Sequence, residues 1–212
     1  MNKERKLHGN KETVVKVCNW LSLPLQALGC CILYLVIEAF SRHSLAAAWS
    51  YMVESPWVFL YNAFLIFTTF MVVYLFRRRV LVRLIMSCFW LLLGIINGVI
   101  LANRVTPFTG PDLRNLSDGA KVVTKYLSKG TMILVAAALV ALLAFFVWVW
   151  IKGPKFQGKI RWYLNVPLIA LVIVLFTGAT NLALAKRVLS SYFVNIAFAY
   201  QDYGYPYCLA VT

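Results

Sequence analysis

The fold of this chain is decided by stretches such as residues 84–101, LIMSCFWLLLGIINGVIL, which run without a single charged side chain. A helix rises 1.5 Å per residue, so on the order of 20 apolar residues cross the hydrocarbon core of a bilayer. Four more apolar stretches of about this length occupy residues 20–40, 57–76, 131–151 and 163–184. The sequence therefore predicts five membrane-spanning segments.

These segments are expected to be helices, because a backbone in lipid must satisfy its own hydrogen bonds. A β-barrel would show alternating apolar and polar residues, and these runs do not. Composition agrees, since 62 % of the 212 residues are hydrophobic and only 13 % are charged. The predicted fold class is all-α, a polytopic membrane protein with five transmembrane helices over residues 20–185 and amphipathic interfacial helices on its outer face.

The positions of Lys and Arg predict the orientation in the membrane. With a cytoplasmic N-terminus, the inside segments hold thirteen basic residues and the outside segments hold eight, and the inside segments are the shorter and denser ones. Five crossings then place the basic residues 1–19 inside the cell and residues 186–212 outside it. The first span is expected to stay as an anchor, because it is longer than the apolar region of a signal peptide.

The net charge of +14 lies almost wholly in short loops and at the ends of the chain. No soluble domain is available to display these charges as a groove for nucleic acid, so no nucleic-acid partner is expected. The expected partners are the lipid bilayer and its anionic headgroups. The five cysteines show neither the spacing of a metal site nor that of a disulfide framework.

Two segments outside the spans are predicted to form interfacial helices. In the outer loop over residues 103–130, Pro111 and Asp112 suit the first turn of a short helix, and a second helix is expected from Ser117 or Asp118 to Gly130. That second helix serves either as a connector or as a surface that binds anionic lipid. After the fifth span, residues 187–200 are expected to form an amphipathic juxtamembrane helix, and the chain then turns away.

Catalytic groups are almost absent from the sequence. Neither His8 nor His43 belongs to a metal-binding or nucleophile-activating pattern. The only acid within a span is Glu38, which lies four residues before Arg42, so it either forms a pair with that residue or contacts a lipid headgroup or Arg104. We expect Arg83 to extend toward the inner interface. Transport is disfavoured because the spans hold so few charges.

Neutral polar residues in the spans are expected to form hydrogen bonds between helices rather than to bind ligands. They are Gln26, Asn97, Asn165, Thr177 and Asn181. The pattern from Gly94 to Gly98 would allow another helix to approach the third span closely.

Taken in order, these features resemble the N-terminal membrane domain of the lipoteichoic acid synthase family, the sulfatase-like phosphoglycerol transferases of Gram-positive bacteria. The resemblance covers nearly the whole chain. Its most specific parts are Arg-Val-Thr-Pro-Phe-Thr at residues 104–109 and the tyrosine-rich segment that ends at Cys208. Further features are Glu38 before Ser41-Arg42, Tyr61-Asn62 in the second span, the three arginines at residues 77–79, Asp112-Leu113, and Tyr200 before Asp202-Tyr203.

The resemblance implies a bacterial cell membrane protein with a larger role than this chain can perform. Members of the family continue past the fifth helix into an extracellular α/β domain. There a metal ion, usually manganese, and a threonine nucleophile move glycerol phosphate from phosphatidylglycerol to a growing polymer. That domain is missing here and Thr212 has no context of a nucleophile, so the chain alone is expected to hold no catalytic residue, metal or cofactor. Its last residues, Leu209 to Thr212, read like a cut made ahead of another domain.

Two sets of residues are the candidate sites. Arg104 and Arg114, with Glu38, Lys121 and Lys125, are candidates for binding a lipid headgroup or polymer phosphate, because guanidinium groups hold phosphate by paired hydrogen bonds. The competing account is that Arg104 is solvated or structurally paired. Candidates for docking the missing catalytic domain are the aromatic residues Tyr192, Phe193, Tyr200, Tyr203, Tyr205 and Tyr207.

The leading hypothesis is therefore the membrane-anchoring domain of such a transferase. The alternative is a small membrane protein that stands alone, binds anionic lipid or a partner protein, and catalyses nothing.

Overall fold

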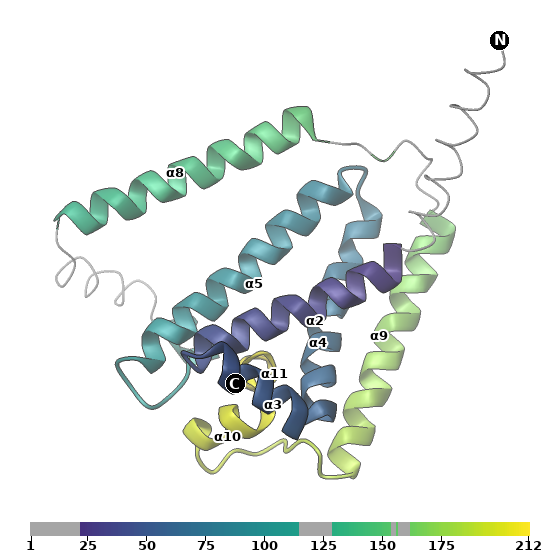
Figure 1. The fold of residues 1–212 in the computed structure, drawn as a ribbon. Helices are drawn as coiled ribbons and strands as arrows, with labels where there is room; N and C mark the ends of the chain where they lie inside the picture. Colours follow the sequence, from purple (N-terminus) through teal and green to yellow (C-terminus); the bar gives the residue numbers. More distant parts are fainter. Residues whose placement is uncertain (1–21, 115–128, 154–155, 157–161) are drawn as a thin grey trace.

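A computed structural model of the chain describes residues 22–114, 129–153, 156 and 162–212. The described part is entirely helical and contains no strand (Figure 1). Four of its helices are long and apolar enough to cross a membrane: Ser22–Ser41, Pro56–Leu75, Arg79–Leu101 and Trp162–Ala185. The protein is a multi-pass membrane protein.

The long helices begin and end within a few residues of the apolar stretches in the sequence. They are α2 (Ser22–Ser41), α4 (Pro56–Phe70), α5 (Arg79–Leu101), α8 (Lys129–Lys152) and α9 (Trp162–Ala185). Helix α4 runs on into a short 3₁₀ helix, η1 (Met71–Leu75). Helix α8 has 24 residues and contains the fourth apolar stretch of the sequence.

Helix α4 lies at the centre of the bundle, in contact with α2 on one side and α9 on another. Of the span that α4 forms with η1, 56 % is buried, against 6 % of the span in α9. Its inward side chains, such as Phe59 and Ile66, form the main apolar core with Tyr34 and Ile37 of α2. Because α4 has few positions that face lipid, its polar side chains are the ones that can hold other segments in place.

Helices α2 and α5 pack against each other, and the two glycines of the third span lie at this contact. A Cβ atom at Gly98 would come within 2.7 Å of the Phe40 carbonyl oxygen, and one at Gly94 within 3.1 Å of the Ile37 side chain. The expectation that Gly94 and Gly98 let another helix approach closely is confirmed.

Helix α8 is the least integrated of the long helices. In Figure 1 it runs beside α5, apart from the other helices. Its C-terminal end contacts the turn before α5, where the Arg78 guanidinium lies 4.8 Å from the Trp150 ring. The bundle proper is therefore built from α2, α4, α5 and α9.

Four short helices complete the described part. They are α3 (Leu45–Glu54), α6 (Gly110–Arg114), α10 (Ile196–Tyr203) and α11 (Tyr205–Val211). The short helix expected at Pro111 and Asp112 is present as α6. The interfacial helix expected from Ser117 or Asp118 to Gly130 lies almost wholly outside the described residues.

The structure corrects the prediction for the C-terminal segment. Residues 187–195 are not helical, because Arg187 adopts a positive φ of 56° and ends the preceding turn. The helix starts only at Ile196, where the Asn195 side chain accepts a hydrogen bond from the Ala197 amide. The residues after it do not turn away but form α11 and pack onto the bundle. We call α10 and α11 together the C-terminal cap.

Candidate functional site

The C-terminal cap covers one end of the helix bundle, beside α3 and the adjoining ends of α2 and α4 (Figure 1). Four consecutive residues, Tyr205 to Cys208, are buried there, and Tyr205 is completely inaccessible. Tyr205 and Tyr207 belong to the main apolar cluster, together with residues of α2 and α4 that lie more than a hundred residues away in the sequence. The cap is thus part of the packed core.

Glu38 of α2 holds the first turn of α11. Its carboxylate is completely buried, and Oε1 accepts a hydrogen bond of 3.1 Å from the Tyr205 backbone amide. The second oxygen accepts a bond of 3.0 Å from Nε of Arg42. Arg42 in turn donates to the Gln201 carbonyl at 2.7 Å and lies 4.0 Å from the Tyr51 ring. The pair between Glu38 and Arg42 therefore ties both cap helices to α2.

Asn62 of α4 fixes the turn between the two cap helices. Its amide nitrogen donates to the Tyr203 carbonyl at 2.8 Å, and its oxygen accepts from the Tyr207 amide at 2.8 Å. Between these residues Gly204 has a φ of 79°, and a Cβ there would come within 2.8 Å of Nδ2 of Asn62. Only glycine adopts this conformation readily, so the turn is specific for Gly204.

Asn97 of α5 plays the same part for the outer loop. It is completely buried, donates to the Ser41 hydroxyl at 2.9 Å, and accepts from the Phe108 amide at 2.8 Å. The bond to Ser41 confirms the expectation that Asn97 links two helices. The bond to Phe108 also brings the Thr-Pro-Phe-Thr turn over the end of α5.

Arg104 is structurally paired. It forms a bidentate ion pair with Asp112, at 3.1 and 2.5 Å, and also donates to the Thr106 and Pro107 carbonyls. Partial burial opposes ionisation of Asp112, but the hydrogen bonds from Arg104 and Thr109 lower the pKa of Asp112 below its usual value. Four of the five N–H donors of the guanidinium are thus engaged within the loop.

The candidate residues for phosphate binding are not drawn together. Within the described residues, no hydrogen bond or ion pair joins Glu38 to Arg104, because each is committed to its own local partners. Arg114 is exposed at the end of α6. Lys121 and Lys125 lie outside the described residues. Binding of a phosphate group by these residues stays a prediction.

The aromatic candidates for docking divide into two groups. Tyr200, Tyr205 and Tyr207 are buried within the protein, so their side chains are not available to a second domain. Tyr192 is 76 % exposed, and Phe193 stacks on Tyr203 with ring centroids 6.0 Å apart. The buried tyrosines hold the cap to the bundle, and Tyr192 with the edge of the Phe193 and Tyr203 stack remains open to a partner.

The polar side chains at this end of the bundle hold the backbone of the C-terminal cap in place. Among the described residues, no group of three or more His, Cys, Asp or Glu side chains is placed to bind a metal ion. Burial and the nearby charges of Glu38 and Asp202 raise the pKa of the Cys208 thiol to about 12, so this cysteine is a poor nucleophile. The polar residues at this end act by orienting the cap.

Sequence reasoning missed Asn62 as a functional residue, although its place in an apolar span was a visible signal. An amide in the middle of a span needs partners, and here these partners are backbone groups of residues 203 and 207. Comparisons with known proteins add no further candidate: no protein family, curated protein or solved structure matches this chain.

Proposed function

We propose that this chain is the membrane-anchoring domain of a lipoteichoic acid synthase-like phosphoglycerol transferase of the bacterial cell membrane. In this proposal α8 is the fourth of five crossings, the N-terminus is cytoplasmic, and the C-terminal cap lies on the extracellular side. The domain holds an extracellular catalytic domain close to the membrane. That domain uses phosphatidylglycerol and a divalent metal, manganese by resemblance, to build a glycerol phosphate polymer.

The observation that carries the proposal is the attachment of the cap to the bundle through Glu38 and Asn62. A flexible linker would let a following domain sample many orientations, whereas a packed cap fixes the point from which that domain starts. The last residue contacts the outer loop, since the Gly110 amide donates to the Thr212 hydroxyl at 3.4 Å. This geometry suits an enzyme whose lipid substrate lies at a fixed height in the bilayer.

A groove at the same end of the bundle supports a lipid substrate. It has a volume of about 710 Å³ between α4 and α9, with walls that include Leu60, Phe64 and Leu182. The exposed Lys186 also lines it. Apolar walls with a cation at the rim suit an acyl chain below an anionic headgroup.

The test is the release of diacylglycerol from phosphatidylglycerol in proteoliposomes with Mn²⁺. The product of the complete gene is expected to release it, and the 212-residue chain alone is expected to match a heat-killed control. Asn62→Ala in the complete product should lower the rate at least several-fold, while Asn103→Ala, which removes an exposed amide in the turn after α5, should not. Phosphatidylglycerol left intact by the complete product, or cleaved by the 212-residue chain, contradicts the proposal.

The alternative function is a non-enzymatic membrane protein that binds anionic lipid or a partner protein. The packing of Tyr205 and Tyr207 into the core favours it, because these aromatic side chains are used within the bundle and are not presented to a second domain. The same assay separates the two, since the alternative expects phosphatidylglycerol to be retained and never cleaved.

A further inference from the structure

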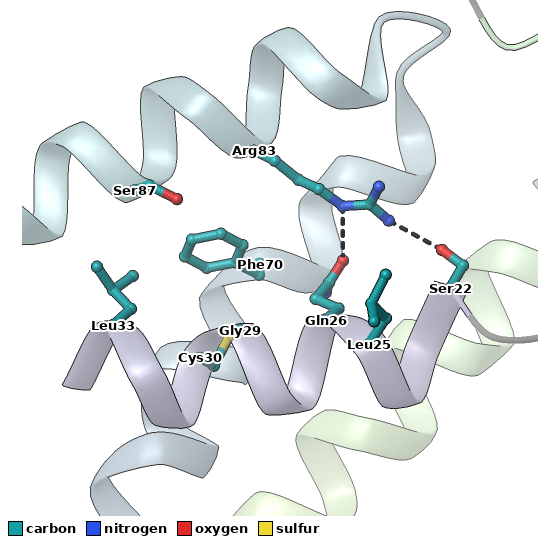
Figure 2. Close-up of a pocket in the computed structure, with 9 residues that line it drawn as sticks. All are labelled: Ser22, Leu25, Gln26, Gly29, Cys30, Leu33, Phe70, Arg83 and Ser87. Carbon is teal, nitrogen blue, oxygen red and sulfur yellow. Dashed lines mark hydrogen bonds between the residues drawn. The ribbon is translucent and has the colours of Figure 1, made fainter. Parts of the chain in front are cut away.

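The end of the bundle opposite the cap contains a second cavity, of about 370 Å³, between α2 and α5 (Figure 2). We call this end, which begins with the arginines at residues 77–79, the basic end. Leu25 and Gly29 lie at the exposed edge of the cavity, so it opens sideways between the two helices. Phe70 and Leu33 close its inner side.

Arg83 reaches across this cavity from α5 to α2, as Figure 2 shows. Its Nε donates to Oε1 of Gln26 at 3.1 Å, and an Nη donates to the Ser22 hydroxyl at 2.9 Å. Both acceptors are neutral, and in the part of the chain that the structure describes no carboxylate pairs with Arg83. Arg83 differs in this from Arg42 and Arg104, which both have acidic partners.

Gln26 adds a second unsatisfied group. The residue is only 7 % exposed, and its amide Nε2 is buried with no hydrogen-bond partner among the described residues. Buried amide donors are nearly always paired, so an unpaired one beside an uncompensated cation indicates a missing acceptor. An acceptor that also carries negative charge satisfies both groups.

We propose that the cavity binds the phosphate group of an anionic phospholipid in the leaflet at the basic end. Arg83 supplies charge-assisted hydrogen bonds, Gln26 and Ser22 hold its side chain in place, and Leu25 and Leu33 contact the acyl chain. This proposal does not rest on the transferase role proposed above.

The depth of Arg83 suits a phospholipid rather than a soluble anion. Arg83 follows Arg79 by one helical turn, about 6 Å along the axis at 1.5 Å per residue. If the arginines at residues 77–79 lie among the headgroups, Arg83 lies where phosphates meet acyl chains. An arginine buried any deeper in lipid without a partner would be costly.

The test is native mass spectrometry of the purified chain with dioleoyl-phosphatidylglycerol, using dioleoyl-phosphatidylcholine as the zwitterionic comparison. Arg83→Gln should weaken retention of phosphatidylglycerol about tenfold, the effect of losing a charge-assisted hydrogen bond. The matched control is Arg77→Gln, which removes the same charge at an exposed position outside the cavity and should change retention less than twofold. A third arm adds glycerol phosphate, which should not displace the lipid at millimolar concentration.

A second variant tests the cavity without touching Arg83. A Cβ at Gly29 meets nothing within 4 Å, so Gly29→Leu should fold, fill the cavity and reduce retention of phosphatidylglycerol about as much as Arg83→Gln. Gly178→Leu on α9, where a Cβ also meets nothing within 4 Å, is the control and should have no effect. Equal losses from Arg83→Gln and Arg77→Gln, full retention by Gly29→Leu, or displacement by glycerol phosphate would each overturn the proposal.

Discussion

The two ends of the helix bundle use buried polar side chains in opposite ways. At the cap end, Glu38 and Asn62 use their oxygens and amide to bind backbone groups of residues 203–207. At the basic end, Arg83 and Gln26 bind each other and leave an amide donor unpaired beside a cavity. A polar side chain within a span therefore does not by itself indicate a ligand site. It does so only where the protein's own chain leaves its hydrogen-bonding groups without partners.

Removing the amide of Asn62 should have the largest effect on this contrast. Asn62→Ala leaves the Tyr207 amide and the Tyr203 carbonyl without partners in a buried site, at a cost of about 3 kcal/mol in the free energy of unfolding. We expect the Tm in detergent to fall by about 10 °C. Asn103→Ala serves as the control and should shift the Tm by less than about 2 °C, because Asn103 is exposed in the turn after α5 and its side chain bonds only to the nearby Val99 carbonyl. Equal shifts for the two variants would mean that the cap is not held by Asn62.

Gly204→Ala should be the next most damaging change. The alanine would have to adopt a backbone φ of 79°, and its Cβ would overlap the Tyr34 hydroxyl. We therefore expect the free energy of unfolding to fall by about 2–3 kcal/mol and proteolysis after residue 195 to become faster. Gly178→Ala on α9 meets nothing within 4 Å and should raise stability slightly. If Gly204→Ala resists protease as well as the unchanged protein does, the turn between α10 and α11 tolerates a side chain at residue 204.

Moving α2 away from α5 should weaken the packing at both ends of the helix bundle. In Gly98→Ala the added methyl group lies 2.7 Å from the Phe40 carbonyl, and moving the helices apart should cost about 1–2 kcal/mol. The bond between Asn97 and Ser41 should lengthen with it. Thermal unfolding of Gly98→Ala beside Gly29→Ala, which has open space, measures the effect, and an unchanged Tm for Gly98→Ala would argue against close packing there.

The smallest effect is expected at the outer loop. Because the pKa of Asp112 is lowered, its ion pair with Arg104 stabilises the loop above the unfolded pKa of about 4 and is lost as the pH falls through the lowered value. Both side chains are partly exposed, so the contribution is below about 0.5 kcal/mol. The protection of the Thr109 amide against hydrogen exchange should be constant from pH 8 to 5 and should decrease only below about pH 4. A loss of protection between pH 8 and 5 would point to another group.

The sequence predicted those parts of the fold that depend on neighbouring residues. Apolar runs located the long helices, the glycines at 94 and 98 located the α2 to α5 contact, and Pro111 with Asp112 located α6. All of these signals lie within one turn or one span of the residues they describe.

The C-terminal cap was missed because its partners are distant in the sequence. Tyr205 is held by a carboxylate 167 residues before it, and Tyr207 by an amide 145 residues before it. From its sequence alone, a segment rich in tyrosine and interrupted by Gly204 and Pro206 resembles a linker. Only the tertiary structure brings it together with Glu38 and Asn62. The cavity at Arg83 was missed for the same reason, since Gln26 and Arg83 lie 57 residues apart.

If the C-terminal cap is a packed part of the bundle, the Cys208 thiol is shielded from solvent reagents. Cys208 is 1 % exposed, whereas Val194 in the preceding loop is 92 % exposed. We compare the maleimide labelling rate of a variant that keeps only Cys208 with that of a cysteine-free variant carrying Val194→Cys, both in mild detergent. We expect the Cys208 thiol to react at least about 100-fold more slowly than the thiol at position 194, because Cys208 is buried and its pKa is raised to about 12. Rates within a few-fold of each other would contradict it.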